Sequence, residues 1–329
     1  MNTKIIKGGL SYFNSLIQSK HRPIPLYVNI FYTRRCNLRC DFCAAIKNPA
    51  KTGLTLDQWK ECSDILFSLG NRFISITGGE PIIRRDLPAF INYLSKKSRL
   101  HSVISNGRLL NEDRLRELAE AGLMHLGVST QSLIPGKHVK SQNRELFEMI
   151  LKYKKKYRFE VSALITLTSD NVEEVPDIVR FLGQKGINVA PNIVTSGQGS
   201  WWFRNYCPTL QFNKTNFHKL KKTIDYLSRA KNVIYSGNYL EDIYKYAQGQ
   251  KPFLCEAGSA YLSINDDGYV MPCQDFAPTK IHYTKLAALY PIKKPNCNDC
   301  MWPCYYEETY KRNHSLAFAV QSARRVFNI

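Results

Sequence analysis

Strand-like and helix-like segments alternate between residues 26 and 194, and this alternation constrains the fold of the 329-residue chain more than any other feature. Segments rich in β-branched and aromatic residues, which favour strands, lie at 26–32, 72–77, 101–105, 125–129, 159–167 and 188–194. Apolar residues recur at helical spacing between them, at 56–69, 86–97, 111–121, 141–155 and 172–184. Strands that alternate with helices form parallel sheets. We therefore predict an α/β fold in which six units make a partial (β/α)6, TIM-like barrel, too few to close.

Three cysteines lie within eight residues directly after the first predicted strand: Cys36, Cys40 and Cys43. In a barrel of this kind, functional groups sit on the loops that follow the strands. Three thiolates can hold three irons of a [4Fe-4S] cluster and leave the fourth iron without a protein ligand. A zinc site is the alternative, but zinc needs a fourth ligand and no histidine lies between residues 22 and 100. The ligand count therefore favours an iron-sulfur cluster with one open iron.

The spacing Cys-x3-Cys-x2-Cys at 36–43 resembles the signature of the radical S-adenosylmethionine (radical SAM) enzymes. The resemblance extends to Gly78, Gly79, Glu80 and Pro81, which follow the second predicted strand and are similar to the second motif of that family. It implies that the open iron binds S-adenosylmethionine, which is cleaved reductively to a 5′-deoxyadenosyl radical that abstracts a hydrogen atom from the substrate. Because glycine has no Cβ, we expect the two glycines to let the backbone approach the methionine moiety closely.

Further cofactor contacts follow from the same resemblance. Phe42 occupies the position where the family places an aromatic residue near the adenine. Ser105 and Asn106 end a strand where polar groups meet the ribose or the carboxylate, and Ser129 ends the next strand. Gln131 departs from the pattern, because many relatives carry an acidic residue there. The departure removes a charge from the site and prevents a detailed inference about the substrate.

A second group of cysteines lies in a turn-rich segment, residues 255–304: Cys255, Cys273, Cys297, Cys300 and Cys304. A short segment with few apolar runs usually needs a metal to hold it together. The group resembles the SPASM and twitch extensions of radical SAM proteins, which hold auxiliary [4Fe-4S] clusters, and residues 265–268 fit a hairpin turn between two ligand-bearing strands. Full SPASM domains have seven cysteines and two clusters, so five cysteines indicate one. Its ligands are Cys255, Cys273 and two or more of the other three; a zinc site is the alternative.

Two cysteines lie outside both groups. Cys62 has a core spacing within a predicted helix and is interpreted as a small buried hydrophobic residue. Cys207 follows an aromatic run at 201–206, which is either a lid over the site or plain packing. Cys207 itself is either a buried thiol or a catalytic hydrogen-atom donor, a role that some relatives give to a cysteine outside the clusters.

The predicted organisation has three parts: a basic amphipathic helix in 1–25, the barrel in 26–200 and a C-terminal region in 201–329. The apolar side of the first helix is formed by Ile5, Ile6, Leu10, Phe13, Leu16 and Ile17. This helix is either a packing arm or a helix that docks on a membrane surface or a partner. Residues 195–200 interrupt the regular alternation and indicate a domain boundary or a mobile loop.

Composition limits the function classes. The formal net charge of +19 favours anionic partners, among which nucleic acid is a minor candidate. No apolar run approaches the roughly 18 residues of a membrane span, and no secretory signal is recognisable, so a cytoplasmic location is expected. In that compartment thiols stay reduced, so ten cysteines indicate metal ligands or reactive thiols rather than disulfides.

The leading hypothesis is a radical SAM enzyme that modifies a peptide or protein, with an auxiliary cluster assisting. It needs an external one-electron reductant of the flavodoxin or ferredoxin type. Only about 25 residues precede the barrel, so recognition of a leader peptide would need a separate protein. The alternatives are radical tailoring of a small molecule, cofactor precursor or lipid and, from another class, a non-catalytic basic iron-sulfur or zinc protein that binds nucleic acid.

Overall fold

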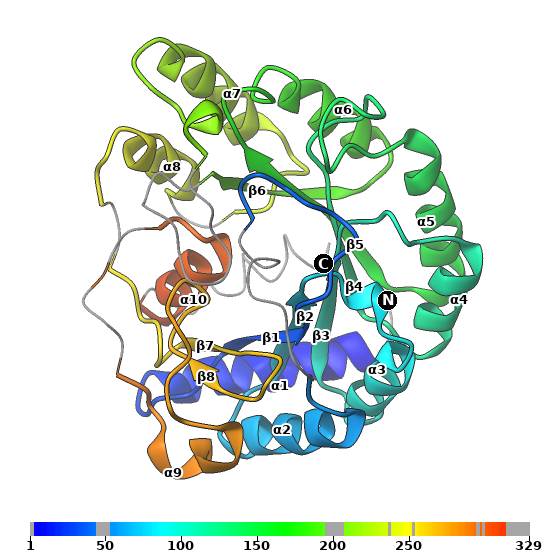
Figure 1. Ribbon diagram of the computed structural model, residues 1–329, viewed down its shortest axis with the longest axis vertical. Helices are drawn as coiled ribbons and strands as arrows, with labels where there is room; N and C mark the ends of the chain where they lie inside the picture. Colours follow the sequence, from blue (N-terminus) through cyan, green and yellow to red (C-terminus); the bar gives the residue numbers. More distant parts are fainter. Residues whose placement is uncertain are drawn as a thin grey trace.

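A single mixed sheet organises the protein, and helices cover its outer side (Figure 1). The computed structural model describes residues 3–43, 53–194, 207–235, 238–251, 254–293, 297 and 300–313. The strands are β1 (Tyr27–Thr33), β2 (Phe73–Gly78), β3 (Leu100–Ser105), β4 (His125–Ser129), β5 (Glu160–Leu167), β6 (Asn188–Ile193), β7 (Tyr261–Ile264) and β8 (Val270–Met271). The helices are α1 (Thr3–Ser19), α2 (Leu56–Ser68), α3 (Leu87–Lys96), α4 (Glu112–Glu120), α5 (Arg144–Tyr157), α6 (Val175–Gln184), α7 (Phe217–Arg229), α8 (Tyr239–Ala247), α9 (Leu286–Leu289) and α10 (Pro303–Asn313).

The six predicted strands form the parallel part of the sheet, which confirms the predicted partial barrel. Their spatial order is β6-β5-β4-β3-β2-β1, so each strand pairs with its neighbours in the chain. The C-terminal region extends this sheet, because β7 pairs in parallel with β1 and β8 pairs antiparallel with β7. The predicted hairpin turn at 265–268 joins β7 to β8, and Gly268 has the positive φ of 84° that such a turn requires.

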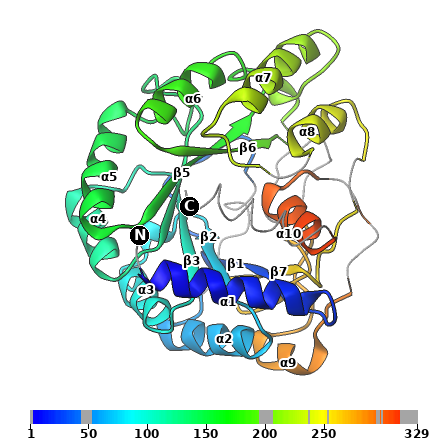
Figure 2. The ribbon, with the colours of Figure 1, turned by 180° about the vertical axis from the view of Figure 1, so that it is seen from behind.

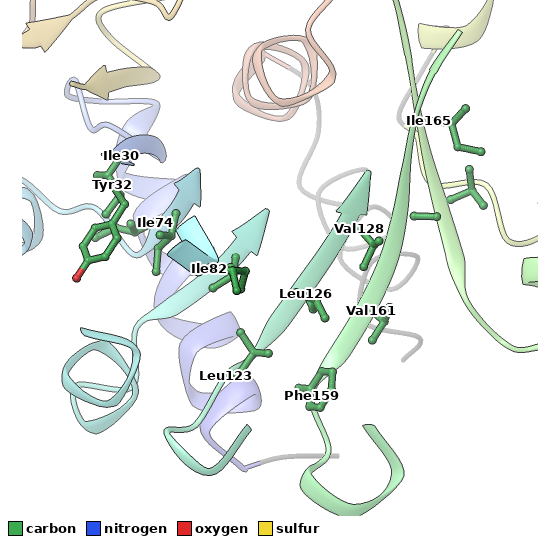
Figure 3. Packing of buried hydrophobic residues seen from close by; sticks show 14 of the residues in the cluster. Ile30, Tyr32, Ile74, Ile82, Leu123, Leu126, Val128, Phe159, Val161 and Ile165 are labelled. Carbon is green, nitrogen blue, oxygen red and sulfur yellow. The ribbon is translucent and has the colours of Figure 1, made fainter. Parts of the chain in front are cut away.

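Side chains that alternate along the strands divide the interior into two environments. On the helix side, Ile30, Tyr32, Ile74 and Leu126 belong to the main hydrophobic core (Figure 3). Cys62 of α2 is fully buried in the same core, as predicted. On the inner side, Asn29 of β1 and its neighbour Ser75 of β2 line a cavity. The strands therefore place apolar residues under the helices and a mixture of polar and apolar residues inside the curve of the sheet.

Helix starts follow the sequence closely. Thr55 and Gln58 form a reciprocal capping box at the start of α2. Asn111 and Asn143 cap α4 and α5 by accepting hydrogen bonds from the backbone N–H groups of Arg114 and Leu146. These caps fix where each helix begins, and hence the lengths of the loops that connect the strand ends to the helices.

Helix α1 packs through only part of the predicted apolar side, with Phe13 partly buried against the small cluster around Leu16. Ile5 and Leu16 are buried, but Ile6, Leu10 and Ile17 are 41%, 67% and 37% exposed. The packed face is completed by small residues that allow close approach, such as Gly8, Ser15 and Ser19. Figure 2 shows α1 lying in front of β1, β2 and β3 when the molecule is seen from behind.

Some sequence predictions fall outside this description. The proposed loop at 195–200 and the aromatic run at 201–206 lie outside the described residues. Among the described helices, none is long and apolar enough to cross a membrane.

Candidate functional site

A cavity of about 270 Å³ lies inside the curve of the sheet and reaches the carboxyl ends of its strands. It brings together most of the predicted site residues: Cys36, Phe42, Cys40, Cys43, Gly78, Gly79, Ser105, Asn106, Ser129, Cys300 and Cys304. The three-cysteine loop and part of the second cysteine group therefore face the same space, although about 260 residues separate them in sequence.

The glycine turn fits against the chain that leads into the three-cysteine loop. A Cβ on Gly79 would lie 2.2 Å from the carbonyl oxygen of Arg35, and one on Gly78 would lie 2.3 Å from that of Thr33. Gly79 N–H donates to the Thr33 carbonyl at 2.6 Å, and Glu80 N–H donates to the Arg35 carbonyl at 2.8 Å. The glycines thus have a steric reason that the sequence did not reveal, because they make room for residues 33–35 and so position Cys36.

Glu80 lies behind the cavity wall rather than in it. Its buried carboxylate accepts hydrogen bonds from Asn106 N–H at 2.7 Å, Ser105 Oγ at 2.9 Å and Ile82 N–H at 3.1 Å. Burial raises the pKa of Glu80, while these donors oppose the shift. Pro81 begins the short 3₁₀ turn Pro81–Ile83 and is also buried. Glu80 and Pro81 therefore fasten the end of β2 to the end of β3 and position the residues that line the cavity.

Asn106 connects the end of β3 to the three-cysteine loop. Its side-chain amide donates to Asn37 Oδ1 at 2.9 Å and lies 3.9 Å from Cys36 Sγ. The Gln142 side chain donates to the carbonyl oxygens of Asn106 and Ser129 at 2.7 and 2.8 Å. Gln142 thereby ties the ends of β3 and β4 together. Sequence reasoning missed it, because a glutamine in a loop carries no motif.

Lys140 is a second residue that sequence reasoning missed. It lines the cavity, and its ammonium group lies 5.2 Å from the centre of the Phe42 ring. Burial raises the pKa of Cys40 to about 11, and the positive charge of Lys140 opposes that shift. Lys140 is the only charged side chain among the described residues of the lining. It therefore provides a cation beside the three thiols.

Four of the five C-terminal cysteines gather in one small cluster of side chains: Cys255, Cys273, Cys300 and Cys304. Tyr261 and Tyr305 pack in this cluster with their rings stacked 3.9 Å apart. Cys255 Sγ lies 2.6 Å from Tyr261 Oη. Burial, Asp275 and the nearby thiols raise the pKa of Cys273 well above its usual value. Cys297 is half-buried, and the residues on both sides of it lie outside the described part of the chain.

Both donor sets fit the iron-sulfur chemistry that the spacing predicts. Three thiols border a cavity with a nearby cation, and four further thiols lie together beside tyrosines. Thiolate sulfur is the usual ligand of [4Fe-4S] clusters. Within the described ranges, no three His, Cys, Asp or Glu side chains are arranged to hold a single metal ion.

Three side-chain contacts connect the three-cysteine region with the C-terminal region. Arg34 forms ion pairs with Asp266 and Asp267 of the hairpin turn, both at 2.5 Å. On the cavity wall, the Asn29 side chain donates to Gln274 Oε1 at 3.2 Å, and both residues are buried. Gln274 directly follows Cys273. The two cysteine groups are therefore held by one connected framework.

Cys207 is not brought into this site. It is half-buried, it precedes the short turn Pro208–Leu210, and its Sγ lies 3.3 Å from Thr209 Oγ1. It is absent from the described lining of the cavity. The hydrogen-donor role of Cys207 stays a prediction.

The curved parallel sheet, the three-cysteine loop after its first strand and the glycine turn after its second strand define a class: partial-barrel proteins that present three thiols at the carboxyl ends of the strands. Residues 30–182, a little under half of the chain, match the Radical SAM superfamily. The family implies a [4Fe-4S] cluster and S-adenosylmethionine.

Two curated relatives match to different extents. A GTP 3′,8-cyclase of Aquifex aeolicus is 34% identical over 187 residues, which are 53% of this chain and 58% of that protein. A PqqA peptide cyclase of Bradyrhizobium diazoefficiens is 26% identical over 260 residues, 76% of this chain and 67% of that protein. The chain thus spans about three fifths of the length of the GTP 3′,8-cyclase and two thirds of the length of the PqqA peptide cyclase.

Among solved structures, Streptococcus suis SuiB bound to S-adenosylmethionine has a TM-score of 0.65 at 18% identity, covering 82% of this chain and 66% of SuiB. SuiB has also been solved with its precursor peptide SuiA. At this identity the likeness establishes a shared fold.

Proposed function

We propose that this protein is a radical SAM enzyme in which Cys36, Cys40 and Cys43 hold a [4Fe-4S] cluster with one iron open to S-adenosylmethionine. Such a cluster would supply the electron that breaks the C5′–S bond of S-adenosylmethionine, so that methionine leaves and the resulting 5′-deoxyadenosyl radical takes a hydrogen atom from the substrate. One observation carries the proposal: the three thiols, the glycine turn and Asn106 all line one cavity.

In this proposal, side chains of the protein bind S-adenosylmethionine and hold the strand ends around it in place. Lys140 provides a cation that attracts the carboxylate of S-adenosylmethionine, and Phe42 offers an aromatic face beside it. Ser105, Asn106 and Ser129 present polar groups at neighbouring strand ends, where they can meet the ribose or the carboxylate. Glu80 and Gln142 do not contact the cofactor but hold these strand ends in place through buried hydrogen bonds.

For the second cysteine group we propose an auxiliary [4Fe-4S] cluster on Cys255, Cys273, Cys300 and Cys304. The number of thiols that pack together equals the number of ligands of a closed cluster. Its role is electron transfer or substrate anchoring, because Cys300 and Cys304 border the same cavity as the first group. Zinc is the competing occupant, and measurement of iron, sulfide and zinc per chain distinguishes the two.

We propose a peptide or protein as the substrate, modified between the two cysteine groups. The match to the PqqA peptide cyclase supports this, because it covers 76% of the chain and so reaches beyond the 30–182 family match. A small molecule is the second candidate, since a GTP 3′,8-cyclase is also similar. The lining favours the peptide: a nucleoside triphosphate needs several cations, whereas Lys140 is the one cation of the described lining.

Two partners complete the proposal. A flavodoxin or ferredoxin type reductant supplies the electron, and the net charge of +19 favours association with such acidic proteins. A separate leader-peptide-binding protein would present the peptide. Identification of the neighbouring reading frames tests this substrate class directly.

The central test is cleavage of S-adenosylmethionine by the reduced, reconstituted protein without substrate. We expect 5′-deoxyadenosine to form, and we expect the Cys40→Ala variant to form none, because the first cluster loses a ligand. Cys62→Ala is the matched control, since this thiol packs in the core and belongs to neither group. Continued cleavage by Cys40→Ala would refute the proposal.

A further inference from the structure

The outward face of α1 carries an apolar stripe. Ile6, Leu10 and Ile17 are 41%, 67% and 37% exposed. Residues spaced by 4 and 11 positions lie on one side of an α-helix, so the three side chains form a line along three turns. Monomeric proteins seldom leave such a line of large apolar side chains in water without a use for it.

The stripe is held outward by firm packing on the other side of α1. Ile5 contacts Leu100 and Met124 in a small buried cluster. A Cβ on Gly8 would lie 2.8 Å from the Leu100 side chain, and Ser15 Oγ donates to the Gly70 carbonyl at 2.9 Å. The helix cannot rotate to bury Leu10 without breaking these contacts. The exposure of the stripe is therefore a fixed property of the fold.

Positive charge surrounds this stripe. No acidic residue precedes Asp41. Five basic residues lie on α1 or directly after it: Lys4, Lys7, Lys20, His21 and Arg22. Lys7 and Lys20 are exposed on α1 or directly after it. A helix that bears large apolar residues beside lysines and no acidic residue has the character of helices that lie flat in a membrane interface.

The neighbouring surface adds further cations. In a parallel β/α fold, the helices that follow the strands return to the end of the sheet where the next strands begin. Helices α3 and α5 end there with the exposed Lys96, Lys155 and Lys156, against one exposed acidic residue, Glu120, at the end of α4. Helix α1 is fastened to the same end, because Arg99 Nη1 lies 3.5 Å from Ser11 Oγ. The stripe and these helix ends thus belong to one face of the molecule.

We propose that this face docks on an anionic lipid bilayer, with α1 in the plane of the headgroups. The lysines would meet lipid phosphates, and Ile6, Leu10 and Ile17 would enter the boundary of the acyl chains. Nucleic acid would account for the lysines but leaves the apolar stripe without a role. The cavity lies toward the opposite ends of the strands, so docking leaves the cysteine groups facing the solution.

Vesicle co-sedimentation of the full chain tests the proposal. We expect binding to vesicles of phosphatidylcholine with phosphatidylglycerol, weak binding to phosphatidylcholine alone, and loss of binding at high salt. Leu10→Gln is expected to weaken binding about tenfold, because one leucine side chain no longer leaves water. The matched control is Ile134→Gln, which removes a 54% exposed apolar side chain from the loop after β4 and should bind as the native chain does.

Three results would overturn the proposal. The first is equal binding of the native chain to neutral and anionic vesicles, or binding to neither. The second is unchanged vesicle binding by Leu10→Gln, whose melting temperature should equal that of the native chain because the residue is exposed. The third is a dimer in analytical ultracentrifugation that Leu10→Gln dissociates, since the stripe would then be covered by a second copy. None of these readouts depends on the proposed chemistry.

Discussion

The two cysteine groups use the same ligand chemistry in contrasting surroundings. Cys36, Cys40 and Cys43 lie on a loop at one side of a cavity, with a lysine and polar strand ends nearby. The second group packs among Tyr261, Tyr305 and Trp302. Burial raises the pKa of Cys40 to about 11 and that of Cys273 well above its usual value. The first setting places the thiols beside a cation and polar strand ends, whereas the second surrounds them with aromatic rings, although Cys300 and Cys304 also border the cavity.

This difference distinguishes the roles of the two cysteine groups, which the number of cysteines in each group does not do by itself. Three ligands beside a cavity and a cation suit a cluster that binds S-adenosylmethionine, and four ligands among aromatic side chains suit a cluster that transfers electrons or anchors the substrate. The framework that joins them, Arg34 with Asp266 and Asn29 with Gln274, holds both groups at the same cavity. The contrast can be tested by replacing a cysteine in each group separately.

The largest expected effect comes from breaking one group at a time. Cys273→Ala should lower the iron content by about four atoms per chain and retain cleavage of S-adenosylmethionine, because the three-cysteine loop is intact. Cys40→Ala should lose a similar amount of iron and all cleavage. Iron analysis and chromatography of 5′-deoxyadenosine measure both variants. Equal loss of cleavage in the two variants would show that the groups do not have separate roles. Point replacements are required, because deletion from residue 255 would also remove β7 from the sheet.

Breaking the framework should have the next largest effect. Arg34→Ala leaves the buried Asp266 carboxylate without its cation, and we expect a loss of about 3–5 kcal/mol in the free energy of unfolding. Urea denaturation followed by circular dichroism measures it. Arg35→Ala is the matched control. The Arg35 side chain is exposed, so its removal should lower the free energy of unfolding by less than about 0.5 kcal/mol. Similar losses in the two variants would contradict a framework role for Arg34.

Local patterns were enough to predict the six strands, the helices between them and the residues of the three-cysteine loop. Their signals depend on neighbours in sequence: strand-like composition, helical spacing and the spacing of the cysteines in 36–43. The placement of Gly78, Ser105 and Asn106 at one cavity also follows, because parallel strands bring their carboxyl ends together. The features that follow from the parallel arrangement of the strands could therefore be predicted from the sequence.

Contacts between distant segments could not be predicted. The pairing of β7 with β1 depends on residues more than 230 positions apart, and so does the ion pair of Arg34 with Asp266. Lys140 and Gln142 have no motif, and only the folded loop after β4 brings them to the cavity. The exposure of Ile6, Leu10 and Ile17 on α1 was also missed, since small residues such as Gly8 complete the packed face and give no apolar signal. Side-chain size and tertiary context decide these features.

The titration of Asp266 also tests the framework that joins the two cysteine groups. Burial raises its pKa to about 6 despite the adjacent Arg34, against an ordinary value of 3.8. A carboxyl whose folded-state pKa is raised stabilises the fold below its unfolded-state pKa, and this contribution is lost as the pH rises through about 6. The native chain should therefore lose about 3 kcal/mol relative to Asp266→Asn between about pH 4 and pH 7. Urea denaturation across this range measures the difference. Asp267→Asn, which keeps Asp266, is the control and should lose stability over this range much as the native chain does.

The smallest expected effect concerns the glycine turn that supports the first group. Gly79→Ala places a Cβ 2.2 Å from the Arg35 carbonyl oxygen, so the chain before Cys36 must move. We expect a loss of about 1–3 kcal/mol in the free energy of unfolding and weaker cleavage of S-adenosylmethionine. Gly9→Ala is the matched control, since no atom lies within 4 Å of the added Cβ on α1 and alanine favours the helix. If Gly79→Ala were as stable and active as Gly9→Ala, the close approach of residues 33–35 would not be what positions the three thiols. The conformation of the three-cysteine loop itself would then position them.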